Sequence, residues 1–160
     1  MPGRQIEKGT PQARLVMAMI DAWLEEDFPR LEELMDRIGS DFGTVFWLLL
    51  VVLGGTIQGI ANYAKKTFDE VLPQLLVQIA VRTENDAAAD LARRALTAWC
   101  TGEDELVINQ NFDEDTANIG PRLVLVQFLG MLASISRSWT NQSGFPMDYV
   151  RTGWAEALGA

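Results

Sequence analysis

The stretch VFWLLLVVLGG, Val45 to Gly55, decides the fold class, because it sets an unbroken apolar run before two glycines in a chain otherwise rich in charge. No charged residue occurs from Phe42 to Ala64. Mean hydropathy over Gly43 to Ala61 is about 1.8, which lies in the range of transmembrane helices. The run is therefore either a membrane span or the buried centre of a helical domain.

Three features favour the buried centre. The strongly apolar part ends at Leu53, and a run of roughly 10 to 14 apolar residues is more often a core helix than a span. The neighbouring segments have amphipathic patterns and need a common apolar partner to cover. Gly55 and Gly59 have the GxxxG spacing, which allows close helix crossings in soluble bundles as well as in membranes. A protein anchored by this one span is the alternative.

Composition predicts one folded domain. The chain has 160 residues, of which 48% are hydrophobic and 22% charged, close to the average for globular proteins and enough to bury a core. We expect residues 1–10 to be a flexible N-terminus and residues 11–160 to form a single helical domain. The single cysteine, Cys100, excludes an intrachain disulfide. The N-terminus is polar and lacks a secretory core, so a cytoplasmic location is expected.

Helical patterns run along the whole chain. Thr10 followed by Pro11 is typical of a helix start, and apolar residues then recur at helical spacing in segment after segment. These patterns predict an all-α, compact bundle of six or seven helices around two central apolar helices, at Val45–Ala64 and Arg122–Trp139. Between Glu103 and Asn109 we expect at most a short helix, followed by a polar connection from Asn109 to Gly120. Strands are the alternative for the apolar runs VFWLLLVVL, LLVQIAV and RLVLVQFL.

The two central segments also suggest an internal repeat. A shift of 75 residues pairs Gly55 with Gly130 and defines two similar halves, 11–83 and 86–158. The two glycine-bearing helices are then expected to meet, with a close crossing at Gly55, Gly59, Gly130 and Ser134. Chance alignment of common apolar residues is the alternative.

No catalytic or metal-binding pattern stands out. The chain contains no histidine, which excludes the commonest general base and zinc ligand. A buried, inert thiol is the preferred interpretation of Cys100. The alternating oxygen ligands from Asn109 to Asp115 fail the calcium-loop pattern, because glycine and the bidentate glutamate are missing at the required positions. We therefore expect no enzymatic activity, no cofactor and no metal.

Charge indicates the kind of partner instead. The formal net charge of −9 argues against direct binding of nucleic acid and favours a basic protein partner or self-association. The candidate acidic interaction surface consists of Glu25, Glu26, Asp27, Glu103, Asp104, Glu105, Asp113, Glu114 and Asp115. Trp47 and Trp139 are candidate interface aromatics.

These observations favour a non-enzymatic helical protein-interaction module, acting as an adaptor, an inhibitor or a self-associating scaffold. Three alternatives remain. An acidic nucleic-acid mimic would block a DNA- or RNA-binding protein, and it requires carboxylates in rows on one face. A helical regulator would bind a small apolar ligand, in a cavity beside Gly55 and Gly130. A single-span membrane-associated regulator would keep Val45–Ala64 in lipid.

Overall fold

The computed structural model describes residues 8–80, 86–100, 102 and 105–160. Every regular element in this part of the chain is a helix, which confirms the all-α bundle, and the strands considered for the apolar runs do not form there. The described helices number eight rather than six or seven. They are α1 (Pro11–Leu24), α2 (Phe28–Asp36), α3 (Phe42–Ala64), α4 (Phe68–Ala80), α5 (Asp86–Cys100), α6 (Glu105–Ile119), α7 (Pro121–Ser143) and α8 (Met147–Leu158).

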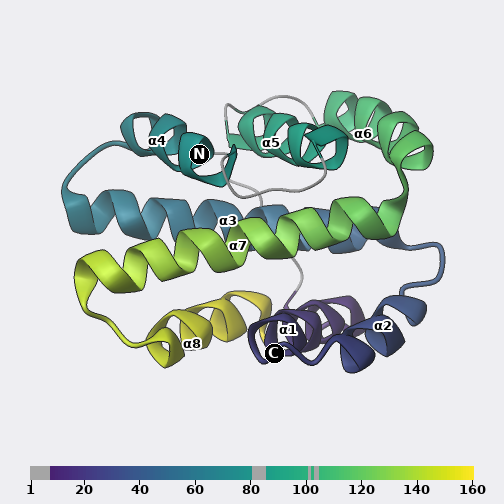
Figure 1. Cartoon of the computed structure of the whole chain (residues 1–160), viewed down its shortest axis with the longest axis horizontal. Coiled ribbons are helices and arrows are strands. Elements are labelled where there is room, and N and C mark those ends of the chain that lie inside the picture. Colours follow the sequence, from purple (N-terminus) through teal and green to yellow (C-terminus); the bar gives the residue numbers. More distant parts are fainter. Residues whose placement is uncertain (1–7, 81–85, 101, 103–104) are drawn as a thin grey trace.

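The helices form three layers (Figure 1). In the middle layer α3 and α7 lie side by side and run in the same direction, so both begin at the same end of the molecule. One outer layer contains α1, α2 and α8, and the other contains α4, α5 and α6. Both central helices contact α1, α4, α5 and α8. The predicted pair of apolar helices therefore forms the centre of the fold, and the amphipathic helices cover it.

Local sequence signals set several helix ends. The hydroxyl of Thr10 accepts a hydrogen bond from the Ala13 N–H at 3.1 Å, and Pro11 occupies the first turn of α1. The Thr67 hydroxyl caps the start of α4, because it accepts a hydrogen bond from the Glu70 N–H, and it also donates one to the Glu70 carboxylate. Residues at positive φ end the two central helices, namely Lys65 after α3 and Gly144 after α7.

The expected polar connection after Asn109 was wrong, because α6 extends through it to Ile119. Two buried side chains one turn apart, Phe112 and Thr116, give this polar segment a narrow face that packs onto the bundle. The ring of Phe112 lies 4.8 Å from that of Phe46 and 6.0 Å from that of Phe128, centroid to centroid. This tertiary packing overrides the low helix propensity of the asparagine and aspartate residues.

The arrangement of α5–α8 resembles that of α1–α4 (Figure 1). Both α3 and α7 have 23 residues, and Phe42 at the start of one corresponds to Pro121 at the start of the other. The spacing between these two helices is thus 79 residues (121 − 42), and Gly55 corresponds to Ser134 rather than to Gly130, whereas α1 and α5 begin 75 residues apart (86 − 11), as predicted. A common origin of the halves stays a prediction. Buried residues coincide at the spacing of the central helices in the pairs Val45/Val124, Phe46/Leu125, Leu49/Phe128, Leu50/Leu129, Val52/Met131 and Leu53/Leu132.

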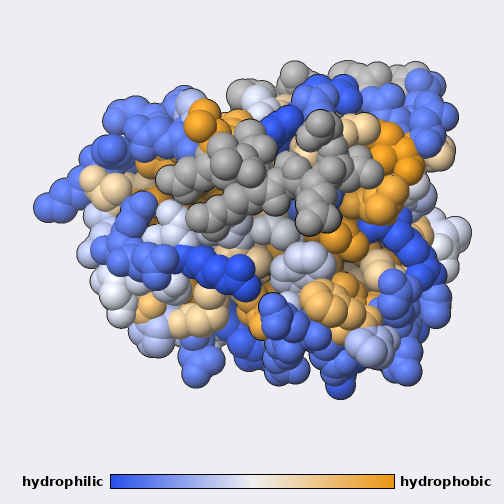
Figure 2. Space-filling model, in the orientation of Figure 1, coloured by the Kyte–Doolittle hydropathy of each residue, from blue (hydrophilic) through white to orange (hydrophobic). Residues whose placement is uncertain are grey.

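Among the described helices, α3 and α7 are long and apolar enough to cross a membrane by length and composition. Their most apolar windows have mean hydropathy of 1.9 and 1.2, and 67% and 50% of the residues in those windows are buried inside the fold. On the face drawn in Figure 2, the coloured residues show apolar patches separated by hydrophilic ones. This burial is compatible with a soluble protein, because the covering helices already occupy much of the apolar surface.

Candidate functional site

The predicted helix crossing at Gly55 was wrong. Gly55 is exposed, and a Cβ placed on it would meet no atom within 4 Å. The close approach occurs one residue earlier, where a Cβ on Gly54 would lie 2.7 Å from Cη2 of Trp99 and closer still to Cζ3. A tryptophan side chain of α5, and not the backbone of α7, therefore fills the space that glycine leaves on α3.

The other predicted crossing residues also face side chains. At Gly59 a Cβ would lie 2.7 Å from Cη2 of Trp139, so this indole occupies the gap on α3. At Gly130 the nearest atom is Cζ2 of Trp23, at 3.7 Å, which is an ordinary van der Waals distance. Ser134 is half-buried on α7. The glycines thus accommodate indole rings, and the signal in the sequence was the number of tryptophans near the ends of apolar helices.

The two candidate interface tryptophans, Trp47 and Trp139, pack against the core. Trp47 is half-buried, and its ring packs edge-on against that of Trp99 at 6.1 Å between centroids. Trp139 is half-buried as well and meets Phe145 edge-on at 6.4 Å. Each indole is anchored by the bundle and presents only part of its surface outside.

The predicted acidic surface is divided in the structure. Glu25, Glu26 and Asp27 are exposed at the turn between α1 and α2, whereas the other described carboxylates belong to α6, in the opposite outer layer (Figure 1). Glu103 and Asp104 lie outside the described residues, as does the side chain of Glu105. The described acidic clusters therefore do not form one continuous face.

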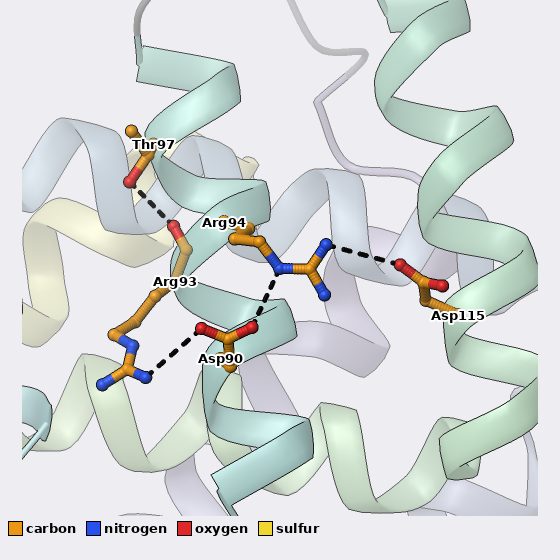
Figure 3. Close-up of polar contacts among 5 residues, drawn as sticks. All are labelled: Asp90, Arg93, Arg94, Thr97 and Asp115. Carbon is orange, nitrogen blue, oxygen red and sulfur yellow. Dashed lines mark hydrogen bonds and ion pairs between the residues drawn. The ribbon is translucent and has the colours of Figure 1, made fainter.

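Within α6 the three acidic residues differ in their partners. Figure 3 shows Arg94 of α5 between two carboxylates, 3.0 Å from Asp90 on its own helix and 3.5 Å from Asp115 on α6. Asp115 is thus used to tie α6 to α5. Asp113 and Glu114, in contrast, are exposed, and they are the α6 carboxylates best placed to meet a partner.

One cavity collects an acidic and an aromatic residue singled out from the sequence. It has a volume of about 640 Å³ and lies where α3 and α7 begin, against α6. We call it the acidic cavity. Its walls include Asp41, Phe42, Phe46, Trp47, Asp113 and Thr116. The fold therefore brings Asp113 and Trp47 to one site, although they are far apart in the chain.

Electrostatics at the acidic cavity combine two carboxylates with the N-termini of two long helices, α3 and α7. The N-terminus of a helix carries roughly half a positive elementary charge. Asp41 stands at this end of α3 and partly offsets that charge, while its side chain accepts a hydrogen bond from Gln12 at 3.2 Å. Asp113 adds a second, exposed carboxylate. The local charge is therefore negative, and it suits a cation.

The walls of the acidic cavity suit an organic cation. Phe42 and Trp47 are half-buried and line the cavity, while Phe46 is buried behind them. Phe42 and Phe46 pack with centroids 5.8 Å apart. Aromatic faces attract ammonium and guanidinium groups. Thr116 is 5% exposed, and its buried hydroxyl has no hydrogen-bond partner among the described residues.

A second cavity, which we call the glycine cavity, lies between α3, α7 and α8. Its volume is about 400 Å³. Its lining includes Val52, Gly55, Thr56, Trp139, Tyr149, Gly153 and Trp154. A Cβ on Gly55 or on Gly153 would have open space around it. Each of these helix-interior glycines costs roughly 0.5–1 kcal/mol relative to alanine, without a packing contact that explains it.

The floor of the glycine cavity is apolar and its polar atoms are mostly paired. The Thr56 hydroxyl, on a residue only 3% exposed, donates to the Val52 carbonyl at 2.8 Å and accepts from Nε1 of Trp154 at 2.9 Å. Nε1 of Trp139 is buried and has no hydrogen-bond partner among the described residues. One donor on a lining residue is therefore left without an acceptor.

Aromatic side chains gather beside this cavity. The ring of Phe145 lies 5.7 Å from that of Tyr63 and 4.8 Å from that of Tyr149, centroid to centroid. These three residues, which we call the aromatic face, are 50% (Tyr63), 36% (Phe145) and 57% (Tyr149) exposed. Exposed aromatics clustered in this way are typical of interaction surfaces.

No group of three or more histidine, cysteine, aspartate or glutamate side chains in the described part of the chain is arranged to hold a metal ion. No known family, no curated protein and no solved structure matches the chain. Function is therefore inferred from the chain's own residues.

Proposed function

We propose that this protein is a non-enzymatic interaction module that binds a basic protein partner, and that its acidic cavity receives a lysine or arginine side chain of that partner. The observation that carries the proposal is the meeting of Asp41 and Asp113 with Phe42 and Trp47 around one open cavity. The net charge of −9 supports the choice of a basic partner, because a field of one sign steers association with the opposite sign.

The residues of the acidic cavity would contribute to binding of a cationic side chain in two ways, through aromatic surface and through charge. Trp47 and Phe42 supply ring surface for the cation, worth about 0.5–2 kcal/mol depending on how far the site is desolvated. Asp113 supplies the charge partner, and an exposed pair of this kind is worth about 0.2–1 kcal/mol. One side chain alone therefore binds weakly, and useful affinity requires the further contacts that a whole partner surface provides.

A test of the cavity uses side-chain analogues of known structure. N-acetylarginine amide is titrated into the labelled protein and followed by NMR, with the neutral isostere N-acetylcitrulline amide as the comparison. We expect the arginine compound to shift the Trp47 indole and Thr116 signals at millimolar concentration, and the citrulline compound to shift them much less. Equal shifts from both compounds, or shifts only elsewhere, would overturn the assignment of the cavity.

Two variants with the same loss of charge separate a specific site from general attraction. Asp113→Asn removes a carboxylate that lines the acidic cavity, whereas Glu114→Gln removes the exposed neighbour that does not. We expect Asp113→Asn to weaken binding of the arginine compound by about 1.4- to 5-fold and Glu114→Gln to change it little. If both variants weaken binding equally, the effect is net charge and not the cavity. The same pair, used as baits in a lysate of the native host, tests the protein partner.

The aromatic face supports self-association as a second candidate function. Its three exposed rings are the kind of residues that dominate interface energies. Light scattering at high protein concentration tests this candidate, with Tyr149→Ser as the variant. A monomer at all concentrations would exclude self-association through this face, and a dimer that Tyr149→Ser dissociates would support it.

A cytoplasmic location belongs to the same proposal and is supported by the burial of the two apolar helices. The membrane-associated alternative predicts that the protein sediments with membranes and resists carbonate extraction. The nucleic-acid mimic stays a prediction, and the separation of the described acidic clusters onto two outer layers does not favour it.

A further inference from the structure

We infer that a groove formed by α1, α2 and the start of α3 is a binding site for a small aliphatic carboxylate, in which an alkyl chain lies on an apolar floor and two arginines hold the anionic end. We call it the arginine groove. Its volume is about 450 Å³, within the range of small-molecule sites. The inference does not rest on the proposed function, because Asp41 is the only lining residue that the arginine groove shares with the acidic cavity.

The floor of the arginine groove is apolar. It consists of Leu15, Ala18, Leu34, Ile38 and Val45. Leu34, Ile38 and Val45 are buried, whereas Leu15 and Ala18 on α1 are only half-buried against the core. These two side chains keep apolar surface that the fold does not cover. An alkyl chain laid along the floor would remove that surface from water, which is favourable in proportion to the area covered.

Two arginines at the arginine groove indicate the charge of the ligand. Arg14 on α1 and Arg37 directly after α2 both line it, and neither forms an ion pair with a carboxylate in the described part of the chain. Arg14 donates one hydrogen bond, from Nη1 to the Gly9 carbonyl at 2.7 Å, which leaves further N–H groups of its guanidinium for a ligand. Four other arginines do pair with carboxylates of the chain, namely Arg93, Arg94, Arg122 and Arg151.

The balance of charge at the arginine groove favours a monoanion. Asp41 lines it as well, and its carboxylate accepts a hydrogen bond from Nε2 of Gln12 at 3.2 Å. Two guanidinium groups and one carboxylate leave a net charge of +1 (2 − 1) on the lining side chains. The first turn of α1, which lines the groove at Pro11 and Gln12, contains no acidic residue and adds positive potential. A carboxylate matches this charge, and its two oxygens fit the fork of a guanidinium group.

The probes are octanoate, 1-octanol and butanoate. Octanoate and 1-octanol share the alkyl chain and differ in charge, whereas butanoate keeps the charge and shortens the chain. Binding is followed by NMR, through the backbone amide signals of the groove and the Nε–H signals of Arg14 and Arg37. Because the chain has a net charge of −9, its overall field repels an anion. Binding of octanoate would therefore report local recognition.

We expect octanoate to saturate one site at the arginine groove. It should bind about 2- to 25-fold more tightly than 1-octanol, because each of two exposed ion pairs contributes about 1.4- to 5-fold. It should bind about tenfold or more tightly than butanoate, because each fully buried methylene contributes about fourfold. Failure of octanoate to saturate a site would overturn the inference. Equal binding of 1-octanol would overturn the role of the arginines, and equal binding of butanoate would overturn the role of the floor.

Two double variants with the same loss of charge locate the anionic end. Arg14→Gln with Arg37→Gln removes both cations of the arginine groove, whereas Arg30→Gln with Arg137→Gln removes two exposed arginines that do not line it. We expect the first pair to abolish the preference for octanoate over 1-octanol and the second pair to preserve it. Equal loss of octanoate binding in both pairs would assign the effect to net charge and overturn the inference.

A third variant tests the floor. Ala18→Leu enlarges a half-buried side chain of the arginine groove without changing charge. We expect it to weaken binding of octanoate and of 1-octanol alike, because the added side chain occupies the place of the alkyl chain. Circular dichroism and a thermal melt check that each variant is folded. Unchanged affinity for octanoate in folded Ala18→Leu and in the folded Arg14→Gln with Arg37→Gln variant would place the probe elsewhere and overturn the inference.

Discussion

Two neighbouring glycines on α3 provide a sharp test of how the bundle packs. Gly54→Ala and Gly55→Ala make the same chemical change at adjacent positions of one helix. Both gain the helix propensity of alanine over glycine, which is roughly 0.5–1 kcal/mol. Because a Cβ at Gly55 meets open space, this gain should appear as added stability.

At Gly54 the same methyl group would clash with the ring of Trp99. It would lie 2.7 Å from Cη2 of Trp99, where carbon atoms prefer about 3.5–4.0 Å. Trp99 is 2% exposed, and its rigid ring already packs against Trp47. Overpacking of a tight core costs typically 1–3 kcal/mol. We place this case at about 2–3 kcal/mol, so that a net destabilisation of about 1–2.5 kcal/mol remains after the gain in propensity.

The difference between the two variants is therefore about 2–3 kcal/mol, or about 4–12 °C in Tm for a chain of this size. Urea unfolding followed by circular dichroism measures it. A double-mutant cycle with Trp99→Phe supplies the control, because the smaller ring should relieve most of the penalty of Gly54→Ala. Equal stability of Gly54→Ala and Gly55→Ala would refute the placement of the indole and the rotation of α3.

Three further predictions concern single contacts. For each variant, urea or thermal unfolding measures the change in the free energy of unfolding. Gly59→Ala should destabilise by about 0.5–1.5 kcal/mol, because the ring of Trp139 lies over it at the edge of the core; a gain in stability would contradict this packing. Arg151→Met should cost about 0.5–1 kcal/mol, since it removes a two-pronged ion pair at 2.6 Å that joins α8 to α1 across a partly exposed surface. This pair, mainly through its hydrogen bonds, raises the pKa of Arg151. Its contribution to the free energy of unfolding is therefore complete below the ordinary pKa of arginine and is lost only as pH rises through the raised pKa. A loss of this contribution between pH 6 and 9 would contradict the pairing. Trp154→Phe should cost about 1–2 kcal/mol, because it removes both indole bulk and the hydrogen bond to the buried Thr56, and an unchanged unfolding free energy would contradict that bond.

The fold class could be predicted from the sequence because apolar residues recur at helical spacing in segment after segment. The cap at Thr10 formed as the Thr10–Pro11 pair predicted. Apolar residues also lie at helical spacing at the end of the chain, where Val150, Trp154 and Leu158 are buried on one face of α8. Signals of this kind act within a few residues, and they need no knowledge of the partner helix.

The rotation of α3 could not be predicted in the same way. A helix that is apolar all round has no polar face to fix which side meets which neighbour. Successive residues differ by about 100° around the axis. Which of Gly54 and Gly55 is packed therefore depends on which of them faces the ring of Trp99 on α5. The sequence therefore located the glycines, and only the tertiary structure separated a packed one from an open one.

The spacing of 79 residues between the two central helices could not be predicted for a related reason. A difference of four residues is about 1.1 helical turns, so shifts of 75 and 79 residues both align apolar positions on the same face. At the central helices the helix ends distinguish them, because Lys65 after α3 and Gly144 after α7 are 79 residues apart. The acidic cavity could not be predicted either. Trp47 and Asp113 are far apart in the chain, and no short-range sequence signal predicts that α3 and α6 meet there.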